Sequence, residues 1–600
     1  MKNTNKEDSE LFKKLGVSNI LDLASLAPTS YEDLTLKEFY VANQNQLIDA
    51  TIKSTAKTNK ILKLKLFSHN LNREINGIIF NSTYFHVKNF SVGSRLFLYG
   101  RMEENFGLQI VQPRIVKEYG EITPKYKSKL RNKTIITLMK KYLTKENLLS
   151  YGLKEEVVES VLKIHNPDLK FLKQFTSCEG FCNKYLYALK YIEIFSHILK
   201  LSKLKTTYKS KDRLNGDLDR FIKSLPFELT NDQKRVIEEI RADFNSDVAT
   251  KRVVMGDVGC GKTMVILSCA VMAYPKKSLL LAPTTVLAKQ IYDEALKYLS
   301  FMKIGFVSNK IKEEDLSGYD FIIGTHALLY RELPDASLVM IDEQHRFGTK
   351  QREMISRLVK KDDKSPHFLQ FSATPIPRTM AMINSSYVDI SIIKELPYKK
   401  DIDTKVLYPK DFNFLVEHIR GEIKEGRQSI IVYPLVEESE VLEYQSIDEA
   451  RGYWEKNFEG VYVTHGKDRE KEDVLESFAK DGNILIATTL IEVGISLPKL
   501  STIVIVAPER LGLATLHQLR GRVSRNGLKG YCYLFTKKEP TRRLKEFCKT
   551  LDGFKIAELD LKLREGGDLL RGDKQSGKQF RFFDMSEDES ILWEVKNVWN

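Results

Sequence analysis

Directly after the apolar residues Val253, Val254 and Met255, the chain reads Gly256-Asp257-Val258-Gly259-Cys260-Gly261-Lys262-Thr263. This order predicts a strand, a glycine-rich turn and the start of a helix, which together form a phosphate-binding loop. In such a loop, backbone N–H groups surround the β-phosphate and the N-terminus of the helix faces the anion. Lys262 is expected to reach the γ-phosphate, and Thr263 to offer its hydroxyl to Mg²⁺. The stretch therefore predicts ATP binding, and the flanking strand and helix disfavour a chance match in an ordinary turn.

Short apolar runs alternate with helical patterns from about residue 226 to residue 537. The runs are RVVM, SLLLAPTT, DFIIGTHA, SLVMIDE, HFLQFSAT, SIIVYPL, VYVTH, NILIATT, TIVIVAP and YCYLF. Unbroken apolar strands are buried on both faces, which requires parallel sheets covered by helices. Ten runs exceed one ordinary sheet, and the polar residues 394–403 are expected to link two lobes. The pattern therefore predicts a multidomain α/β protein with two tandem, doubly wound parallel-sheet domains, at residues 226–396 and 397–540.

The residues before these two domains have a different pattern. Within residues 46–118, short runs of alternating hydrophobicity are separated by Asn, Gly and charged turns, which is typical of a small antiparallel barrel, with the OB-fold as the leading candidate. Residues 1–45 are predicted to be helical, and residues 119–225 to form a strongly basic helical linker. The basic helices could be a solvated spacer or a phosphate-contacting surface, and the sequence leaves both open.

The composition restricts the class of partner. The 600 residues carry a net charge of +14, which favours nucleic acid over a membrane as the partner, although a lysine-rich genome could give the same excess. The six cysteines form no CxxC pair, so a zinc module is not expected, and a cysteine inside the phosphate loop fits a reducing cytosol. Without an apolar leader or a membrane-length apolar stretch, a cytoplasmic protein is expected.

A second chemical motif follows about eighty residues after the phosphate-binding loop, where the apolar run SLVMI ends in Asp342 and Glu343. At the end of a strand, Asp342 would hold Mg²⁺, usually through water. Glu343 would orient and deprotonate the water that attacks the γ-phosphate. Such a pair is common alone, but together with the loop it indicates an ATPase.

Further segments resemble the motifs of helicase superfamily two, in the expected order, and the resemblance implies that the two doubly wound parallel-sheet domains are tandem RecA-like motor domains. The segments are LAPTTVLAKQ from Leu281, GTHAL from Gly324, SAT at 372–374, ATTLIEVGI at 487–495 and QLRGRVSR at 518–525. The resemblance implies contacts to the DNA strand from Thr284, Thr325 and Thr488, and coupling of hydrolysis to movement by Ser372 and Thr374. It also implies nucleotide contact at Gly494, and arginine fingers at Arg522 and Arg525. Gln233 would contact adenine in this superfamily, yet Thr230 and Gln233 also form a capping box, and the two roles could coexist.

Longer segments resemble the RecG family of bacterial branched-DNA helicases. They are DEQHRFG, FSATPIPRTMAM, IEVGISLP, APERLGLATLHQLRGRVSR and DGFKIAELDLKLREGGDLL within 226–580, and LGVSNILDLASLAPTSYEDLT, IIFNSTYF and IHNPD upstream. The resemblance implies a monomeric motor that moves on duplex DNA and drives branched DNA (stalled forks, Holliday junctions, D-loops) against a wedge barrel, with single-strand-binding protein as a candidate partner. It also implies that Phe80 and Tyr84 stack on exposed bases; the alternative is that both belong to the core or rim of the barrel.

The resemblance also assigns residues 541–600 to a translocation hairpin, a loop and a tail, in which Arg543 and Gln575 match the working residues. Three features depart from the family pattern: Ser496 in place of aspartate, Ser524 in place of glycine, and one extra residue near Gln575. The alternatives are the transcription-repair translocase Mfd, which is longer, the fork helicase PriA, whose zinc cysteines are missing here, and a protein that uses ATP only as a conformational switch.

Overall fold

The computed structural model describes residues 6–104, 107–205, 207–308, 315–359, 364–433, 446–466, 468, 470–488, 497–524, 527–571 and 580–598, with the backbone alone at residues 6 and 564–571. The chain forms two compact units. One contains Met1–Lys200 and Gly577–Asn600, and the other contains Leu201–Ser576. None of the described helices is long and apolar enough to cross a membrane.

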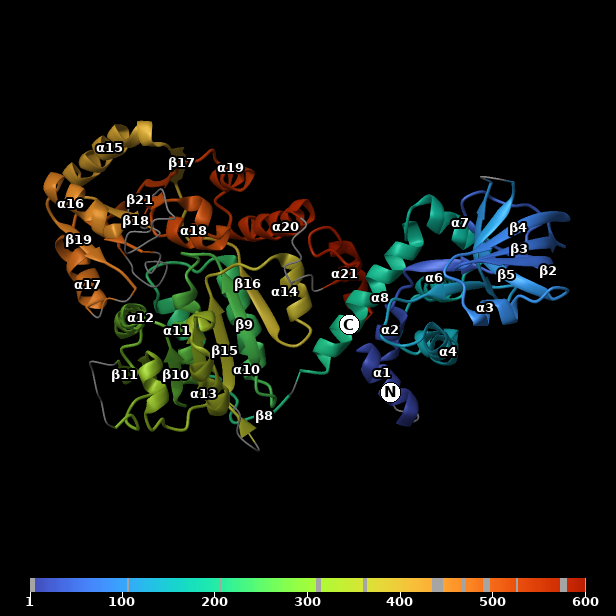
Figure 1. The fold of residues 1–600 in the computed structure, drawn as a ribbon. Coiled ribbons are helices and arrows are strands. Elements are labelled where there is room, and N and C mark those ends of the chain that lie inside the picture. Colours follow the sequence, from blue (N-terminus) through green and yellow to red (C-terminus); the bar gives the residue numbers. More distant parts are fainter. Residues whose placement is uncertain are drawn as a thin grey trace. The chain divides into compact units, whose positions relative to one another are not determined.

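The first unit contains a closed barrel of five strands in the order β2-β3-β4-β6-β5 (Figure 1). The strands are β2 (Asn45–Thr58), β3 (Ile61–Ser68), β4 (Arg73–Ile79), β5 (Arg95–Glu103) and β6 (Gln109–Ile115), and the short helix α3 (Tyr84–Asn89) lies between β4 and β5. On β3, Leu62, Leu64 and Leu66 point into the barrel while Lys63 and Lys65 are exposed. Apolar and polar side chains alternate along β3 because successive residues of a strand point to opposite faces. The closed barrel confirms the prediction from the sequence.

The rest of the first unit is mainly helical, with one two-stranded sheet that the sequence did not predict. β1 (Ser30–Asp33) pairs antiparallel with β7 (Ile122–Lys125), so neither residues 1–45 nor residues 119–225 are purely helical. Cys178 and Cys182 form a disulfide that was also not expected. The helices are α1 (Lys6–Leu15), α2 (Ile20–Ala24), α4 (Asn132–Tyr142), α5 (Lys145–Leu149), α6 (Glu155–His165), α7 (Leu169–Ser177), α8 (Asn183–Ser202) and α21 (Glu589–Asn597).

The end of the chain packs on α8 within the first unit. The carboxylate of Glu193 on α8 accepts the backbone N–H groups of Arg581, Phe582 and Phe583 at 2.7, 2.8 and 2.9 Å. Charge-assisted hydrogen bonds of this kind are stronger than neutral ones. Residues 541–600, which the sequence grouped together, are therefore divided between the two units.

The first sheet of the second unit has seven parallel strands in the order β11-β12-β10-β13-β15-β9-β16. They are β9 (Lys251–Gly256), β10 (Ser278–Leu281), β11 (Ile304–Val307), β12 (Phe321–Gly324), β13 (Leu338–Asp342), β15 (His367–Ser372) and β16 (Asp389–Ile393). Leu280 and Met340 join the core under α10, α11 and α12, while Leu279 and Val339 join the core on the opposite face. Burial of alternate residues on both faces explains why these strands are apolar throughout.

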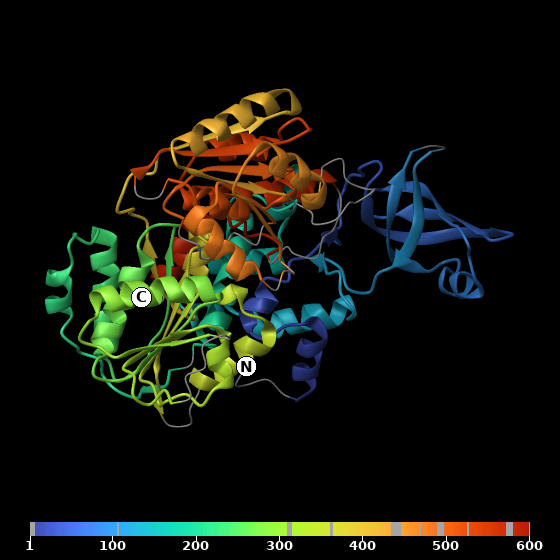
Figure 2. The ribbon, with the colours of Figure 1, turned by 90° about the vertical axis from the view of Figure 1, so that its left-hand side faces the viewer.

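Helices and short elements surround this sheet, as Figures 1 and 2 show. They are α9 (Leu218–Ser224), α10 (Asn231–Phe244), α11 (Lys262–Ala273), α12 (Thr285–Tyr298), α13 (Thr349–Val359) and α14 (Arg378–Asn384), with the two-residue strands β8 (Lys209–Ser210) and β14 (Lys364–Ser365) and the 3-10 turns η1 (His326–Tyr330) and η2 (Gln344–Arg346).

The second sheet has six parallel strands in the order β17-β22-β21-β18-β20-β19, so two tandem parallel sheets are confirmed. The strands are β17 (Ile402–Leu407), β18 (Gln428–Val432), β19 (Val461–Thr464), β20 (Ile484–Ala487), β21 (Leu500–Val506) and β22 (Gly530–Phe535). Ile430 and Ile503 pack on the face covered by α17, α18, α19 and α20, and Ile431 and Val504 pack under α15 and α16. The helices are α15 (Phe412–Lys424), α16 (Ile447–Asn457), α17 (Lys471–Asp481), α18 (Leu513–Arg520), α19 (Arg542–Lys549) and α20 (Gly553–Arg571), and the 3-10 turns are η3 (Pro409–Asp411) and η5 (Pro508–Arg510).

Candidate functional site

The phosphate-binding loop connects β9 to α11 and depends on two glycines in the left-handed region. Gly259 has a φ of +82° and Gly261 a φ of +79°. A Cβ atom on Gly261 would lie 2.2 Å from Nε2 of Gln233, and one on Gly259 would lie 2.6 Å from the hydroxyl of Tyr398. Both the backbone conformation and the close neighbours therefore require glycine at these positions.

Lys262 begins α11 and folds back over the loop. Its Nζ donates to the carbonyl oxygens of Gly256 at 2.9 Å and Asp257 at 3.2 Å. Burial opposes the charge on Lys262, but the neighbouring Cys260, Glu343 and Asp342 raise the pKa of Lys262 above its ordinary value. The side chain is therefore a permanent cation within reach of the loop's backbone.

The two acids lie at the end of β13, as their position after an apolar run predicted. Asp342 is buried, and its Oδ1 has no hydrogen-bond partner among the residues that the structure describes. Burial and the charge of Glu343 raise the pKa of Asp342. Glu343 has a φ of +50°, and its Oε1 accepts the backbone N–H of Ala373 at 2.6 Å. This bond fixes the second acid to the segment that follows β15.

The donor set fits a hydrated Mg²⁺ and a triphosphate. A carboxylate oxygen without a partner and a threonine hydroxyl are hard oxygen ligands, which Mg²⁺ prefers. Asp342 and Thr263 line the same cavity, together with Lys262. These residues can hold the metal against phosphate oxygens.

The cavity has a volume of about 770 Å³ and is lined by residues from both lobes of the second unit. Gln518 and Arg522, from α18 and the turn after it, line the cavity together with the loop and the acid pair; Arg522 is 8% exposed. Gln518 Nε2 donates to the hydroxyl of Thr374 at 2.7 Å, and Gln518 Oε1 accepts from Arg346 at 3.0 Å. The second lobe thus contributes polar groups to the walls of the same cavity.

Gln233 forms the capping box that the sequence indicated. Its Oε1 accepts the N–H of Thr230 at 2.8 Å, and its own N–H donates to the hydroxyl of Thr230 at 3.2 Å. The remaining donor, Nε2, binds the carbonyl of Cys260 at 2.8 Å. Gln233 therefore attaches α10 to the phosphate-binding loop, and its predicted contact with adenine stays a prediction.

The other motif residues occupy different environments. Thr284 caps α12 through the N–H of Leu287 and is half-buried, as are Thr488 and Ser372. Thr325 is only 2% exposed and caps η1, so its hydroxyl cannot reach a DNA strand in this structure, in contrast to the prediction. Four predicted residues lie outside the described part of the chain: Gly494, Ser496, Arg525 and Gln575.

Aromatic side chains are exposed where the barrel was predicted to present them. Phe80, directly after β4, is 45% exposed, and Tyr84, at the start of α3, is 79% exposed. Neither belongs to the barrel core, which excludes the reading of both as core residues. The sequence did not indicate Phe85, which is 70% exposed on the same short helix. The IIFNSTYF segment alone could have pointed to it.

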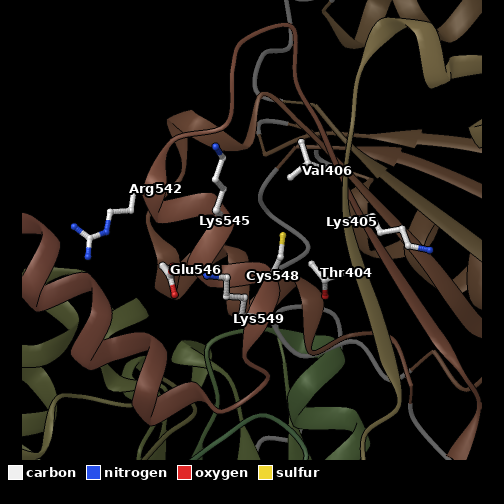
Figure 3. Close-up of a pocket in the computed structure, with 8 residues that line it drawn as sticks. All are labelled: Thr404, Lys405, Val406, Arg542, Lys545, Glu546, Cys548 and Lys549. Carbon is white, nitrogen blue, oxygen red and sulfur yellow. Dashed lines mark hydrogen bonds and ion pairs between the residues drawn. The ribbon is translucent and has the colours of Figure 1, made fainter.

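A basic pocket of about 710 Å³ lies between α19 and the edge strand β17, as Figure 3 shows. Four cationic side chains and one carboxylate line it: Lys405, Arg542, Lys545, Lys549 and Glu546. The adjacent Arg543 is turned elsewhere, since it is half-buried and donates to the carbonyl of Glu509 at 2.9 Å. α19 thus has a cationic side, while one arginine connects it to the second lobe.

Known proteins resemble this chain in sequence and in fold. The DEAD/DEAH box helicase model matches residues 230–383, and the helicase conserved C-terminal domain matches residues 410–527. The ATP-dependent DNA helicase RecG of Helicobacter pylori is 45% identical over 606 residues, covering 98% of this chain and 97% of the relative. RecG of Thermotoga maritima is 34% identical over 641 residues, covering 98% and 81%. The solved structure of RecG bound to a three-way DNA junction matches with a TM-score of 0.57 and 27% identity, covering 99% of this chain and 84% of that chain.

This chain belongs to the RecG family. The structure shows how the chain accommodates one of its departures from the family pattern. Ser524, which replaces the RecG glycine, has a φ of +62°, a conformation that costs little for glycine but is uncommon for other residues. The Ser524 hydroxyl accepts the N–H of Asp401 at 3.2 Å, a bond that glycine could not form and that offsets part of the strain.

The motifs gave no indication of a buried contact between the phosphate-binding loop and the second lobe. His517 Nε2 lies 2.6 Å from Oδ1 of Asp257, and Lys400 Nζ lies 3.3 Å from Oδ2 of the same carboxylate. Asp257 was predicted to contact the nucleotide as part of the loop, but its side chain points to the second lobe. The position of His517 within the segment APERLGLATLHQLRGRVSR was the only available signal.

Proposed function

We propose that this chain is an ATP-driven motor that moves along duplex DNA and separates the arms of branched DNA, such as stalled forks, Holliday junctions and D-loops. Membership of the RecG family and the likeness to a RecG bound to a three-way DNA junction support the proposal. The observation that carries it is the shared cavity, in which the loop and acid pair of one lobe face Arg522 of the other. Such a cavity can turn over ATP only when both lobes are in place.

In the proposed hydrolysis, Lys262 would neutralise charge on the γ-phosphate, and Thr263 and Asp342 would hold Mg²⁺. Bound Mg²⁺ supplies charge compensation for the phosphate oxygens. Glu343 is held by the N–H of Ala373 and orients the attacking water. Arg522, together with Arg525, stabilises the charge that develops in the transition state from the side of the second lobe. Gln233, Gly256, Val258, Gly259, Cys260, Gly261 and Gly494 complete the nucleotide contacts.

We propose that lobe closure is sensed through Gln518. Its amide bridges Thr374 and Arg346, so a shift of α18 changes the position of the segment Ser372–Thr374. Glu343 is bonded to Ala373 in the same segment, which links its orientation to the position of the second lobe. Thr284 and Thr488 are proposed to contact the DNA strand from the two lobes.

Strand separation is assigned to the barrel. Phe80 and Tyr84 expose rings that can stack on unpaired bases, an interaction worth roughly 1–3 kcal/mol per base without sequence preference. The cations around the basic pocket on α19 fit the phosphates of the duplex. Counterion release at such contacts would make binding weaken steeply with salt.

We further propose the division of the chain into an N-terminal segment (1–45), a wedge barrel (46–118), a linker (119–225), two motor lobes (226–396 and 397–540) and a C-terminal part (541–600). A cytoplasmic monomer with single-strand-binding protein as a partner completes the proposal.

The decisive experiment compares ATP hydrolysis stimulated by a forked DNA with that stimulated by linear duplex of equal length. A branched-DNA motor gives a higher kcat or a lower half-saturating concentration with the fork. Equal stimulation by both would overturn the branch preference. Absence of turnover with either DNA would instead favour an ATP-switched binding protein.

A further inference from the structure

The helix α20 begins at a point where three motifs of the motor meet. A Cβ atom built on Gly553, the first residue of α20, would lie 2.7 Å from Nε2 of His517, 2.9 Å from Cγ of Pro375 and 3.0 Å from Oδ1 of Asp257. His517 belongs to the second lobe, whereas Pro375 and Asp257 belong to the first. Contacts of a Cβ atom below 3.0 Å essentially never occur, so only glycine allows the helix to begin here.

The polar side chains at this point are almost fully buried and bonded to one another. Asp257 and His517 are 4% and 3% exposed, and Asp257 Oδ1 also accepts the N–H of Val258 at 2.6 Å. Burial alone would raise the pKa of Asp257, but His517 and Lys400 outweigh it and hold that pKa far below its usual range. The carboxylate is therefore ionised, and it is fixed to the loop by the N–H that it accepts.

Arg520 fixes the tautomer of His517. Its Nη2 lies 3.3 Å from Nδ1 of His517, and a guanidinium can only donate, so Nδ1 is the acceptor. The ring proton is then on Nε2 and is donated to Asp257. Arg520 thus donates to His517, and His517 donates to Asp257 in the phosphate-binding loop.

The same arginine holds the turn of the hairpin formed by α19 and α20. Arg520 is 1% exposed, donates to the carbonyls of Phe547 at 3.0 Å and Thr550 at 2.7 Å, and lies 4.0 Å from the centre of the Phe547 ring. These carbonyls are at the end of α19 and in the turn that leads to Gly553. A continuous path therefore runs from the side chain of Asp257 through His517 and Arg520 to the hairpin, and α20 packs against α18 along it.

We propose that Gly553 is a positioning residue that seats the hairpin on the Asp257–His517–Arg520 path, so that a shift of the phosphate-binding loop against the second lobe is passed to α19 and α20. The inference deepens the proposed function, on which it rests, because it assigns the point where the nucleotide state reaches the hairpin. The added methyl of Gly553→Ala would push the helix start away from His517 and Asp257 without removing any group from the nucleotide cavity.

The test compares full-length Gly553→Ala with Gly421→Ala, whose new methyl on α15 would meet no atom within 4 Å. Duplex-stimulated hydrolysis and the KM for ATP of Gly553→Ala should stay within about threefold of the parent protein, while base pairs separated per ATP on a model fork fall at least tenfold. Gly421→Ala should match the parent protein in both. A parental number of base pairs per ATP in Gly553→Ala, or a proportional loss of both activities, would overturn the proposal.

Hydrogen–deuterium exchange separates this proposal from the proposed function, because it needs no strand separation. ADP with aluminium fluoride should protect peptides over residues 256–264 in all three proteins, but should change exchange over residues 542–556 only in the parent protein and in Gly421→Ala. An unchanged hairpin response in Gly553→Ala would reject the positioning role, even if the parent protein failed to open a fork. Should Gly553→Ala not fold, Arg520→Lys replaces it, because a lysine cannot reach the carbonyls of both Phe547 and Thr550. The same results are then expected, and the same results would overturn the proposal.

Discussion

The Nε2 atom of His517, on the second lobe, lies 2.6 Å from Oδ1 of Asp257, in the phosphate-binding loop of the first lobe. Both side chains are almost fully buried and neither lines the nucleotide cavity, so this contact joins the lobes outside that cavity. Because Asp257 is also fixed to the backbone of the loop, the second lobe is in direct mechanical contact with the segment that is expected to hold the phosphates.

Lys262→Ala should abolish ATP hydrolysis while DNA affinity stays within about threefold. The ammonium lies in the nucleotide cavity and bonds to the loop carbonyls of Gly256 and Asp257, far in sequence from the barrel aromatics. Steady-state phosphate release and fork binding by fluorescence anisotropy check both parts. Near-normal turnover would discard the assignment of the cavity as the ATPase site.

Arg522→Ala should still bind ATP but hydrolyse it about 10³-fold more slowly, as expected for loss of an arginine finger. Single-turnover hydrolysis, with nucleotide affinity measured in parallel, tests this. Arg522→Lys should recover little of the rate, because an ammonium cannot reproduce the planar fork of donors. A loss of less than tenfold in Arg522→Ala would mean that another cation acts in this role.

Replacement of Phe80 and Tyr84 by alanine should preserve DNA-stimulated hydrolysis but reduce fork unwinding at least tenfold, because the motor would advance without holding the separated bases. Phe414→Ala, which removes a 52% exposed ring from α15 in the second lobe, is the matched control and should behave like the parent protein. Equal loss of hydrolysis and unwinding would point to a misfolded barrel. Adding Phe85→Ala tests whether the third exposed ring contributes.

Arg543→Ala should leave hydrolysis within a fewfold of the parent value and reduce unwinding much further. The guanidinium donates to the carbonyl of Glu509, so its loss removes one of the contacts that hold α19 on the second lobe. A hydrogen bond from a charged donor contributes about 1.5–3 kcal/mol, enough to loosen a short helix. Arg451→Ala, at an exposed arginine on α16, is the control. Parental unwinding per ATP would show that the contact is dispensable.

Acidification should destabilise the first unit through His165. Burial lowers the pKa of His165 to about 4, and the neutral ring accepts from the hydroxyl of Tyr126 at 2.8 Å and donates to the carbonyl of Ala24 at 2.9 Å. Between the unfolded pKa near 6.5 and the folded value, the unfolded chain binds more protons, so stability falls as the pH decreases. The expected loss is about 1 kcal/mol at pH 5.5 relative to pH 7.5.

Hydrogen exchange of peptides from α6, corrected for the intrinsic effect of pH, measures this loss in the intact chain. His165→Gln keeps a donor and an acceptor but cannot be protonated in this range, so the pH dependence should be smaller in the variant by the same amount. An equal decline with pH in both proteins would assign the effect to other groups.

The order of residues was sufficient to predict the glycine-rich loop, the acid pair and the parallel strands. These features depend on local backbone geometry and on how apolar residues are spaced along the chain. The positive φ angles of the loop require glycine at Gly259 and Gly261. Strands that are buried on both faces of a sheet require unbroken apolar runs. The barrel likewise followed from the alternation on strands such as β3.

Tertiary structure decided what no local pattern contains. The side chain of Asp257 turns away from the cavity to His517, 260 residues later in the chain. Thr325 is buried, and the segment before the last helix is held on α8 by the three backbone N–H groups that donate to Glu193. These outcomes depend on which surfaces meet when the sheets pack, and sequence spacing carries no information about contacts between segments so far apart.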